Sequence, residues 1–454
     1  MIAVTDCFGK IQVFRERVLP ILASDTRRRL ASGAFWGGVG GGVVRVLLLM
    51  TSLFLARVLG REKFGEYGMV TSTTALFCAF GGLGVGSAIT RYVALLRKTD
   101  RERAGRILSL SVFMTCVSGI LTGGCFALLA PILAQNVLAA PHLTGALRIA
   151  AMSMALGIVN GAQQAALAGF EAFKTSAWIG GIGGIFQAVA VCVGAYCWDV
   201  NGAVAGLAAS ILFSAIVSHF SIYRHMKNEG VPSRWRGMWT EWRVLVGFSL
   251  PAFLTMVIAS PVDWGCNAFL ANQPNGYTEL GLLNAAGQWR AAVAFLPWLL
   301  CTAAMPVMSE RYGNTGDGGT LQLMFRLMGV MVAVVVPVTI VMCLAGDFIL
   351  RGYGASFVGG LWVLVLTLVT AAIQSIIVPC WYFFFSSNRV WACFFMNGGL
   401  GILSIGLTWL MIQYGALGVS SARCLAMTVH AGWIILYAFH IARNESIPKE
   451  RRLS

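Results

Sequence analysis

The chain contains a series of apolar stretches that are each long enough to cross a lipid bilayer. The first covers the 23 residues 34–56, and its single charged residue is Arg45. A spanning helix needs about 20 mainly apolar residues, because the hydrocarbon core is about 30 Å thick. Backbone polar groups in lipid must be bonded within their own segment, and runs this long and continuous do not suit barrel strands. We therefore predict an all-α polytopic membrane protein.

The overall composition and the charge pattern support this fold class. Hydrophobic residues make up 57% of the chain and charged residues 11%, whereas a soluble domain carries about 25% charged residues. The hydrophobicity profile predicts about twelve spans, at 34–56, 67–90, 107–130, 147–168, 177–197, 203–223, 244–270, 281–307, 321–345, 361–383, 391–413 and 416–440.

The net charge of +15 follows the membrane topology. With the N-terminus inside, the predicted cytoplasmic segments hold 24 Lys and Arg residues and the outer loops hold 4. Positive loops stay on the cytoplasmic side, so both termini are predicted to be cytoplasmic. The basic residues therefore serve membrane topology, and we expect no nucleic-acid partner.

The twelve predicted spans divide into two similar halves. The hydrophilic segment 223–243 lies near the middle of the chain, and two short motifs, Phe54-Leu55-Ala56 and Gly202-Ala203, recur about 215 positions later. Two parallel repeats around a central site are a transporter architecture. We thus predict two six-helix lobes around a central cavity, with these domains: a cytoplasmic segment 1–33, an N-terminal lobe 34–223, a linker 224–243, a C-terminal lobe 244–440 and a cytoplasmic tail 441–454.

Buried charges are the candidate functional residues. An arginine at the centre of a span costs roughly 2.5–3.5 kcal/mol on insertion scales, so Arg45 needs a partner. That partner is either a substrate anion or Asp263, which is the only acid well inside any predicted span. Arg290 in the eighth span and Arg423 in the twelfth are further intramembrane cations. Neutral polar side chains in the spans can contact substrate or bond neighbouring helices; these are Asn160, Gln163, Gln164 and Gln288.

The sequence offers no pattern typical of an enzyme. The spans contain almost no acids, the five histidines are dispersed, and no glycine-rich phosphate loop with its lysine is present. We expect no catalytic residue, no metal site and no cofactor.

Residues 56–67 read Ala-Arg-Val-Leu-Gly-Arg-Glu-Lys-Phe-Gly-Glu-Tyr. This segment resembles the connection after the first helix in polysaccharide-unit flippases, which belong to the same exporter superfamily as multidrug (MATE) transporters and peptidoglycan-precursor flippases. Residues 247–251 and 414–418, together with Asp263, are similar to that family too. The resemblance covers roughly residues 30–440, and it implies a V-shaped, two-lobed fold and alternating access.

The resemblance also implies a substrate. In peptidoglycan-precursor flippases, arginines on the first and eighth helices are implicated in binding the lipid diphosphate, and Arg45 and Arg290 match them by helix and approximate depth. The hypothesis is a bacterial inner-membrane flippase for an undecaprenyl-diphosphate-linked oligosaccharide, used in O-antigen (lipopolysaccharide) or exopolysaccharide assembly. The predicted substrate-binding residues are Arg45, Arg290, Arg423, Asn160, Gln163 and Gln288, and Asp263 is predicted to gate the site or pair with a charge.

Further partners and two alternative functions remain open. Six basic residues in the run 91–106 suit anionic membrane lipids, with about 1 kcal/mol per residue near the surface. A polysaccharide polymerase complex is a further candidate partner. One alternative is a cation-coupled multidrug antiporter, which the absence of an acid in the first span disfavours. The other is a membrane-embedded polymerase or ligase, which the short outer segments 131–146 and 346–360 disfavour.

Overall fold

The computed structural model describes residues 25–445, apart from 244, 246–248, 250–252, 254–258 and 388. The predicted cytoplasmic segment up to residue 24 and the tail from residue 446 lie outside the described residues. Within those ranges every regular element is a helix, so the prediction of an all-α membrane protein is confirmed.

The helices follow one another in two groups of similar length. The first group is α2 (Asp25–Gly81), α3 (Val85–Leu96), α4 (Arg101–Ile132), α5 (Thr144–Gly169) and α6 (Phe173–Glu229). The second is α8 (Ala259–Ala271), α9 (Gly276–Leu344), α10 (Gly346–Tyr353), α11 (Leu361–Ser386), α12 (Val390–Met411) and α13 (Gly415–Glu445). Short helical turns connect them: η2 (Leu133–Val137), η3 (Pro141–Leu143), η4 (Met238–Glu241), η5 (Ala355–Phe357) and η6 (Ile412–Tyr414).

Several of these helices contain two membrane crossings. The 57-residue α2 is broken at Gly60, whose φ of 73° is outside the helical range. Similarly, α6 is broken at Trp198 and Asp199. The 69 residues of α9 would be about 100 Å long if straight, far more than a bilayer requires. Seven stretches of the described chain are long and apolar enough to span a membrane, and twelve crossings remain a prediction that agrees with these lengths.

Two predicted boundaries differ from the structure. The second span, expected to be continuous over 67–90, is interrupted between α2 and α3, where Leu83 and Gly84 have φ of 48° and 66°. The loop expected at 308–320 is instead helical and belongs to α9. In both places local hydrophobicity reports the depth of a residue, but it does not report whether the backbone turns.

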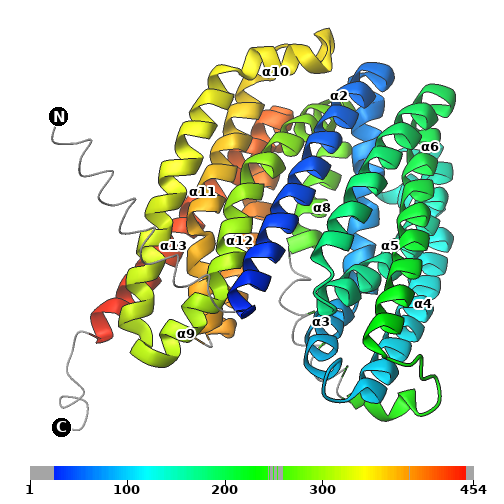
Figure 1. Ribbon diagram of the computed structural model, residues 1–454. Coiled ribbons are helices and arrows are strands. Elements are labelled where there is room, and N and C mark those ends of the chain that lie inside the picture. Colours follow the sequence, from blue (N-terminus) through cyan, green and yellow to red (C-terminus); the bar gives the residue numbers. More distant parts are fainter. Residues whose placement is uncertain are drawn as a thin grey trace, which may run out of the picture.

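The molecule has two ends, which we name after helices that lie there. Figure 1 shows α10 at one end and α3 at the other, with the long helices running between them. The connections predicted to face outside, including the turn at Gly60 and the η2–η3 segment, contact one another at the α10 end. We therefore identify the α10 end with the predicted outer side and the α3 end with the cytoplasmic side.

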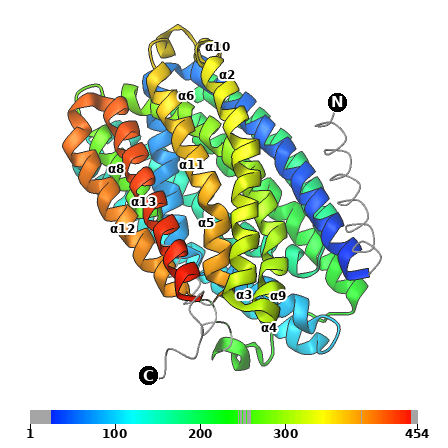
Figure 2. The ribbon, with the colours of Figure 1, turned by 90° about the vertical axis from the view of Figure 1, so that its left-hand side faces the viewer.

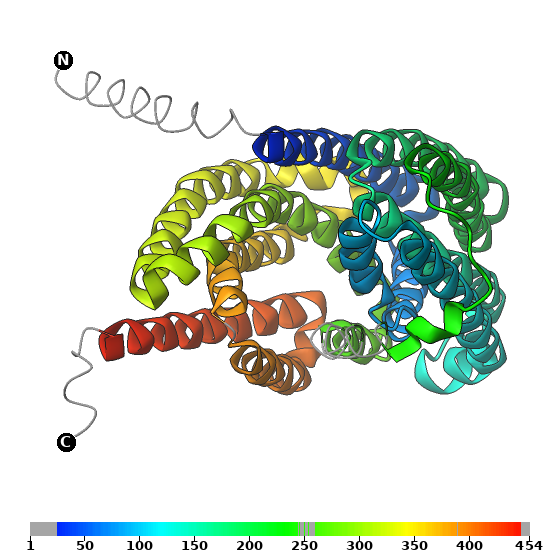
Figure 3. The same cartoon turned by 60° about the horizontal axis from the view of Figure 1, so that its bottom comes forward.

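The hydrophobic core divides in the same way. One cluster joins both halves of the chain and includes Phe64, Leu138, Leu270 and Tyr353, which lie toward the α10 end. Two further clusters of the described residues lie toward the α3 end: one contains residues 85–245 only, and the other contains residues 308–441 only. Figures 2 and 3 show the two groups of helices side by side, with α2 next to α9. The halves thus share a core at the α10 end and have separate cores at the α3 end.

Candidate functional site

A polar pocket of about 290 Å³ lies among α8, α9, α11 and α13. Its charged lining residues are Asp263 of α8, Arg290 of α9 and Arg423 of α13, and most of the other lining residues are uncharged polar side chains. The pocket therefore carries one negative and two positive charges, a formal balance of +1. Polar groups in this number are unusual within a membrane-spanning domain and indicate a functional site.

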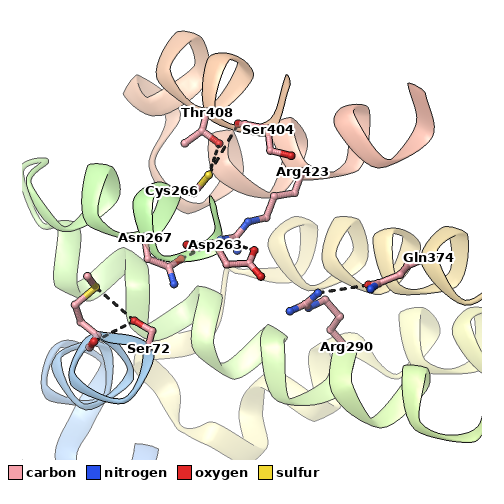
Figure 4. Close-up of polar contacts among 10 residues, drawn as sticks. Ser72, Asp263, Cys266, Asn267, Arg290, Gln374, Ser404, Thr408 and Arg423 are labelled. Carbon is pink, nitrogen blue, oxygen red and sulfur yellow. Dashed lines mark hydrogen bonds and ion pairs between the residues drawn. The ribbon is translucent and has the colours of Figure 1, made fainter. Parts of the chain in front are cut away.

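Arg423 is held by α8. Its Nη2 atom lies 3.5 Å from the Asp263 carboxylate and donates to the Asp263 carbonyl at 3.3 Å and to the Asn267 side-chain oxygen at 3.1 Å. Figure 4 shows all three residues meeting between the two helices. The Nε of Arg423 is buried and has no hydrogen-bond partner among the described residues, so the guanidinium keeps donors for a ligand.

Arg290 is more weakly held. Its Nη1 lies 3.5 Å from the Gln374 side-chain oxygen, which is longer than the roughly 2.7–3.2 Å that such bonds prefer. In Figure 4 the guanidinium of Arg290 and the carboxylate of Asp263 point toward each other. Because an arginine has five N–H donors in a rigid fork, one long contact leaves most of its bonding capacity unused.

The pocket contains further polar atoms without partners. Asn284 Nδ2 and Ser420 Oγ, which both line the pocket, are buried and have no hydrogen bond within the part of the chain that the structure describes. Most buried polar atoms in folded proteins are paired, and an unpaired one costs about 1–3 kcal/mol. With a net positive charge and unused N–H and O–H donors, the pocket is suited to an anion that has several acceptor oxygens.

The depth of the pocket follows from helix geometry. Arg290 lies 14 residues after the start of α9 at the α10 end, which corresponds to about 21 Å along the helix. Arg423 lies eight residues after the start of α13, or about 12 Å. The pocket is thus inside the membrane domain, at depths of about 12–21 Å from the α10 ends of these helices.

The structure does not place Arg45 in this pocket. It also does not form the ion pair with Asp263 that the sequence suggested, because Asp263 pairs with Arg423. In the described part of the chain no hydrogen bond or ion pair to Arg45 is formed, and its side chain is half-buried on α2. The sequence left the partner of Arg45 open between Asp263 and a substrate anion, because hydropathy gives the depth of a charge in the membrane but not the helix that it faces.

Arg45 nevertheless lies near the pocket in depth and direction. Gly38 and Gly41 of α2 approach Leu299 and Phe295 of α9 so closely that an added Cβ would come within 2.9 Å of either side chain. Positions three and four apart share a helix face, so Arg45 lies on the face that meets α9. Since α9 runs antiparallel to this part of α2, one further turn brings Arg45 level with Gln288 and Arg290.

The predicted neutral residues are divided between two places. Gln288 lines the pocket. Asn160 donates to Ser214 at 3.2 Å, and Gln164 donates to Ser218 at 3.0 Å, so both bond α5 to α6. Gln163 lines a separate groove in the first half of the chain. Gln163 and Gln164 are adjacent in sequence but therefore face different surroundings, the groove and α6 respectively.

Four polar pocket residues were not anticipated from the sequence, namely Asn267, Thr367, Thr370 and Ser420. Two of them lie one helical turn from a predicted site residue: Asn267 follows Asp263 by four positions, and Ser420 precedes Arg423 by three. Residues at this spacing share a helix face. A search for polar neighbours one turn from each buried charge would have found these two.

The segment 57–68, which carries the sequence motif, closes the α10 end above the pocket. We call this segment the latch. Its Arg61 forms an ion pair with Glu279 at 2.8 Å and donates to the carbonyls of Thr278 and Ser356 at 2.8 and 3.2 Å. Its Arg57 donates to the carbonyl of Gly352 at 2.7 Å. Both arginines thus connect the first half of the chain to the second.

Close backbone packing supports these polar contacts. A Cβ at Gly65 would lie 1.9 Å from the carbonyl oxygen of Tyr277, and a Cβ at Gly281 would lie 2.0 Å from that of Arg61. Such distances are possible only for glycine, and small residues allow membrane helices to approach in this way. A Cβ at Gly68 would overlap the side chain of Asn284, so the latch packs directly on a wall of the pocket.

Loops next to the latch add further contacts between the two halves of the chain at the α10 end. The Tyr277 hydroxyl donates to the Leu138 carbonyl at 2.7 Å. Burial, together with the nearby Glu66 carboxylate, raises the pKa of Tyr277, so the hydroxyl keeps the proton that it donates. The Asn272 amide donates to the Val137 carbonyl at 2.7 Å. These contacts place the η2 region of the first half against the start of α9.

This fold is that of the transporters in the MOP superfamily. A multidrug resistance MATE family transporter of that superfamily, solved in an inward-facing conformation, matches 88% of this chain and 99% of its own with a TM-score of 0.69 at 13% identity. The lipid II flippase MurJ in an inward closed conformation matches 88% of this chain and 86% of its own, with a TM-score of 0.66 at 13% identity. At such low identity the likeness concerns the fold.

The sequence places the chain within a family. The family described as polysaccharide biosynthesis protein matches residues 30–311. The EPS I polysaccharide export inner membrane protein EpsE of Ralstonia solanacearum is 24% identical over 403 residues, covering 85% of this chain and 89% of the relative. EpsE of Ralstonia nicotianae is 25% identical over 414 residues with the same coverage. The chain belongs to the polysaccharide biosynthesis protein family, and the resemblance predicted from residues 56–67 is confirmed.

Proposed function

We propose that the protein is a flippase that moves an undecaprenyl-diphosphate-linked oligosaccharide from the cytoplasmic to the outer leaflet of the bacterial inner membrane, for exopolysaccharide or O-antigen assembly. The observation that carries this proposal is the donor-rich pocket with Arg290 and Arg423 and a net positive charge. Membership of the polysaccharide biosynthesis family and the names of the Ralstonia relatives support the same class of cargo. The protein then acts as a transporter and not as an enzyme.

The pocket chemistry suits a diphosphate. A guanidinium donates two parallel hydrogen bonds to phosphate oxygens and stays charged at any relevant pH. Arg290 has donors available for such a bidentate contact, and Arg423 has an unpaired Nε. Asp263 partly neutralises Arg423. A diphosphate that enters the pocket competes with the Asp263 carboxylate for Arg423. Asp263 thus pairs with the arginine until the substrate anion replaces it.

The latch supports a mechanism of alternating access. The α10 end is closed by Arg57, Arg61 and Gly65, and because this end is predicted to be the outer side, the proposal takes the conformation to face the cytoplasm. Outward release requires the latch to separate, and Asn284 connects the latch to the pocket wall. Arg45, which lies level with Arg290 on the facing helix, is proposed as a contact for the head group from the first half of the chain.

The membrane potential can drive this step. Moving one negative charge outward across a membrane whose inner side is negative is favourable by about 2.3 kcal/mol per 100 mV. A diphosphate that crosses with two negative charges gains about twice that amount. No separate coupling cation is required for net outward movement.

A cation-coupled multidrug antiporter is the second candidate, because Asp263 is a half-exposed carboxylate inside the pocket. Coupling to Na⁺ or H⁺ in such carriers uses an intramembrane carboxylate. The two arginines in the same pocket oppose a cationic cargo by charge repulsion, since like charges brought together disfavour binding. Protection of cells from cationic dyes without a defect in surface polysaccharide would favour this second function.

The proposal is tested by replacing the pocket arginines. Arg290→Ala and Arg423→Ala are each expected to reduce outward delivery of the lipid-linked oligosaccharide at least tenfold, since a charge-assisted hydrogen bond contributes about 1.5–3 kcal/mol. The matched control is Arg326→Ala, which removes an exposed arginine of α9 outside the pocket. Full delivery by both pocket variants at normal protein level would refute the assignment.

A further inference from the structure

A second cavity lies in the first half of the chain and shares no lining residue with the charged pocket. It has a volume of about 690 Å³ and runs between α4 and α6 over α5, with residues 231–235 at its α3 end. Its walls are mostly apolar and include Leu108 and Val112 of α4, Val159 of α5, and Ile222 and Met226 of α6. We call it the α4–α6 groove. Its size and chemistry suit a hydrocarbon chain.

The groove has a basic and aromatic mouth. Lys227 lies two residues before the end of α6, is exposed, and forms no ion pair with any residue that the structure describes. Tyr223 and Trp235, which also line the groove, are 66% and 54% exposed. Trp and Tyr with exposed rings at a helix end are typical of the lipid head-group level. The mouth therefore opens at the cytoplasmic surface of the membrane.

Basic and acidic residues both lie around this mouth, and Arg106 pairs with Glu241 at 3.3 Å. Arg101 lies beside Gly230 and Arg106 beside Gly237, at the two ends of the segment that covers the groove. Clusters of basic residues next to the cytoplasmic leaflet attract acidic lipids. Lys227 is the basic residue that lines the groove itself, so it is the natural contact for a lipid phosphate.

One polar side chain inside the groove has no partner. Gln163 of α5 is 8% exposed, and its Oε1 makes no hydrogen bond within the described chain. It lies six residues before the end of α5, about 9 Å below the head-group level. An ester group of a phospholipid at that depth has only acceptor oxygens, so Gln163 would meet it with its NH₂ donor, with the oxygen and nitrogen of the side-chain amide exchanged. Gln163 therefore marks a place for a polar group of a ligand.

We propose that the α4–α6 groove binds one acidic phospholipid of the cytoplasmic leaflet. Its phosphate contacts Lys227, its ester group lies beside Gln163, and one acyl chain packs against Val112 and Val159. The lipid fills the space between α4 and α6 and thereby stabilises the first half of the chain. This inference does not depend on the proposed function, because it applies whatever cargo the charged pocket takes.

The test measures lipid retention by the full-length protein. The protein is reconstituted in vesicles of phosphatidylethanolamine and phosphatidylglycerol in equal amounts, and retained lipid is counted by native mass spectrometry after mild detergent release. The wild type is expected to retain one phosphatidylglycerol. Lys227→Ala should lower this retention about fivefold, since one basic residue near the surface contributes about that factor. The control is Lys174→Ala, whose ammonium lies over the ring of Trp36 outside the groove.

Two further variants keep the inference falsifiable. Gln163→Leu preserves the size of the side chain and should lower retention without loss of folded protein. Ala162→Trp fills the groove and should abolish retention, with size-exclusion and thermal unfolding reporting whether the fold is kept. Equal retention in the wild type, Lys227→Ala and Gln163→Leu would overturn the proposal.

Two other occupants are distinguished in the same experiment. Preferential capture of undecaprenyl phosphate from doped vesicles would show that the groove takes a prenyl chain, and this would overturn the proposal. A dimer that disappears in Ala162→Trp would show that a second copy covers the groove, with the same consequence. Loss of transport by the Arg290 variant with normal lipid retention would leave this inference standing.

Discussion

The ion pairs at the two ends of the molecule connect different parts of the chain. At the α10 end, the ion pair between Arg61 and Glu279 connects the two halves of the chain. At the α3 end, Arg97 pairs with Glu171 within the first half, and its guanidinium also contacts Glu229. The comparison shows that the halves are joined at the end predicted to face outward and are stabilised separately at the end predicted to be cytoplasmic.

Shape contributes more than charge to the closure. The side chains of Arg61 and Glu279 are 18% and 31% exposed, and partly exposed ion pairs contribute only about 0–1 kcal/mol. Contact of backbone with backbone at Gly65 leaves no room for even one added methyl group. We infer that close packing at Gly65 determines whether the two halves can come together at the α10 end. Arg61 then fixes how the latch is aligned against the start of α9.

The largest effect on this comparison is expected from Gly65→Ala. The added Cβ would overlap the Tyr277 carbonyl, and overpacking of a tight contact costs about 1–3 kcal/mol. Hydrogen exchange of residues 276–281 should rise at least fivefold, while residues 162–170 at the other end remain unchanged. The control is Gly124→Ala, where a Cβ would meet nothing within 4 Å. Unchanged exchange in the Gly65 variant would show that the α10 end closes without this contact.

The next effect is expected at the α3 end from Asp317→Asn. Asp317 accepts two hydrogen bonds from Arg389 at 2.9 and 2.6 Å and is buried. Loss of this charged acceptor should destabilise the second half by about 2 kcal/mol, because an uncompensated arginine remains. Exchange should increase in residues 380–387 and stay constant in residues 57–68. An increase at both ends would mean that the two ends are coupled through the second half.

A smaller effect is expected from Glu279→Gln. The substitution removes the negative charge opposite Arg61 but keeps an oxygen that can accept from the Ala416 N–H. Exchange at the α10 end should rise up to about fivefold, in line with a pair worth at most about 1 kcal/mol. Raising the salt concentration should reduce the difference between wild type and variant, since salt screens exposed charges. A difference that is independent of salt would point to packing and not to charge.

The smallest effect is expected from Tyr277→Phe. This variant keeps the ring but removes the hydrogen bond to the Leu138 carbonyl, for a loss of about 0.5 kcal/mol, the low end of what a neutral hydrogen bond contributes. Exchange should rise in residues 138–143, with residues 57–68 nearly unaffected. Because the raised pKa keeps the wild-type hydroxyl protonated, the difference should not change between pH 6 and pH 9. A difference that disappears toward pH 9 would contradict this reading of the tyrosine.

Much of the fold could be predicted from the sequence, because a bilayer imposes long apolar helices whose approximate positions follow from hydrophobicity. The motif at 56–67 identified the family and proved to be the latch. The break before α3 could not be predicted, since it depends on backbone conformations at Leu83 and Gly84 and not on hydropathy. Residues 308–320 likewise read as a loop and fold as helix.

The candidate site was predicted in part. Asp263, Arg290, Arg423 and Gln288 lie together in one pocket. Asn160 instead bonds α5 to α6 through Ser214, and its role as a sugar contact stays a prediction. The difference has a simple cause. A sequence shows that a polar residue is buried in a span, whereas the packing of helices decides whether it faces a ligand or a neighbouring helix.

By itself the sequence determined the all-helical membrane fold and the family, because hydrophobic length and local motifs are properties of single segments. It also determined that intramembrane arginines need anionic partners. Only the tertiary structure decided the partners, placing Arg423 beside Asp263 and leaving Arg45 on the opposite helix. Charge pairing depends on distances of a few ångströms between segments far apart in the chain, and those distances are set by how the helices pack.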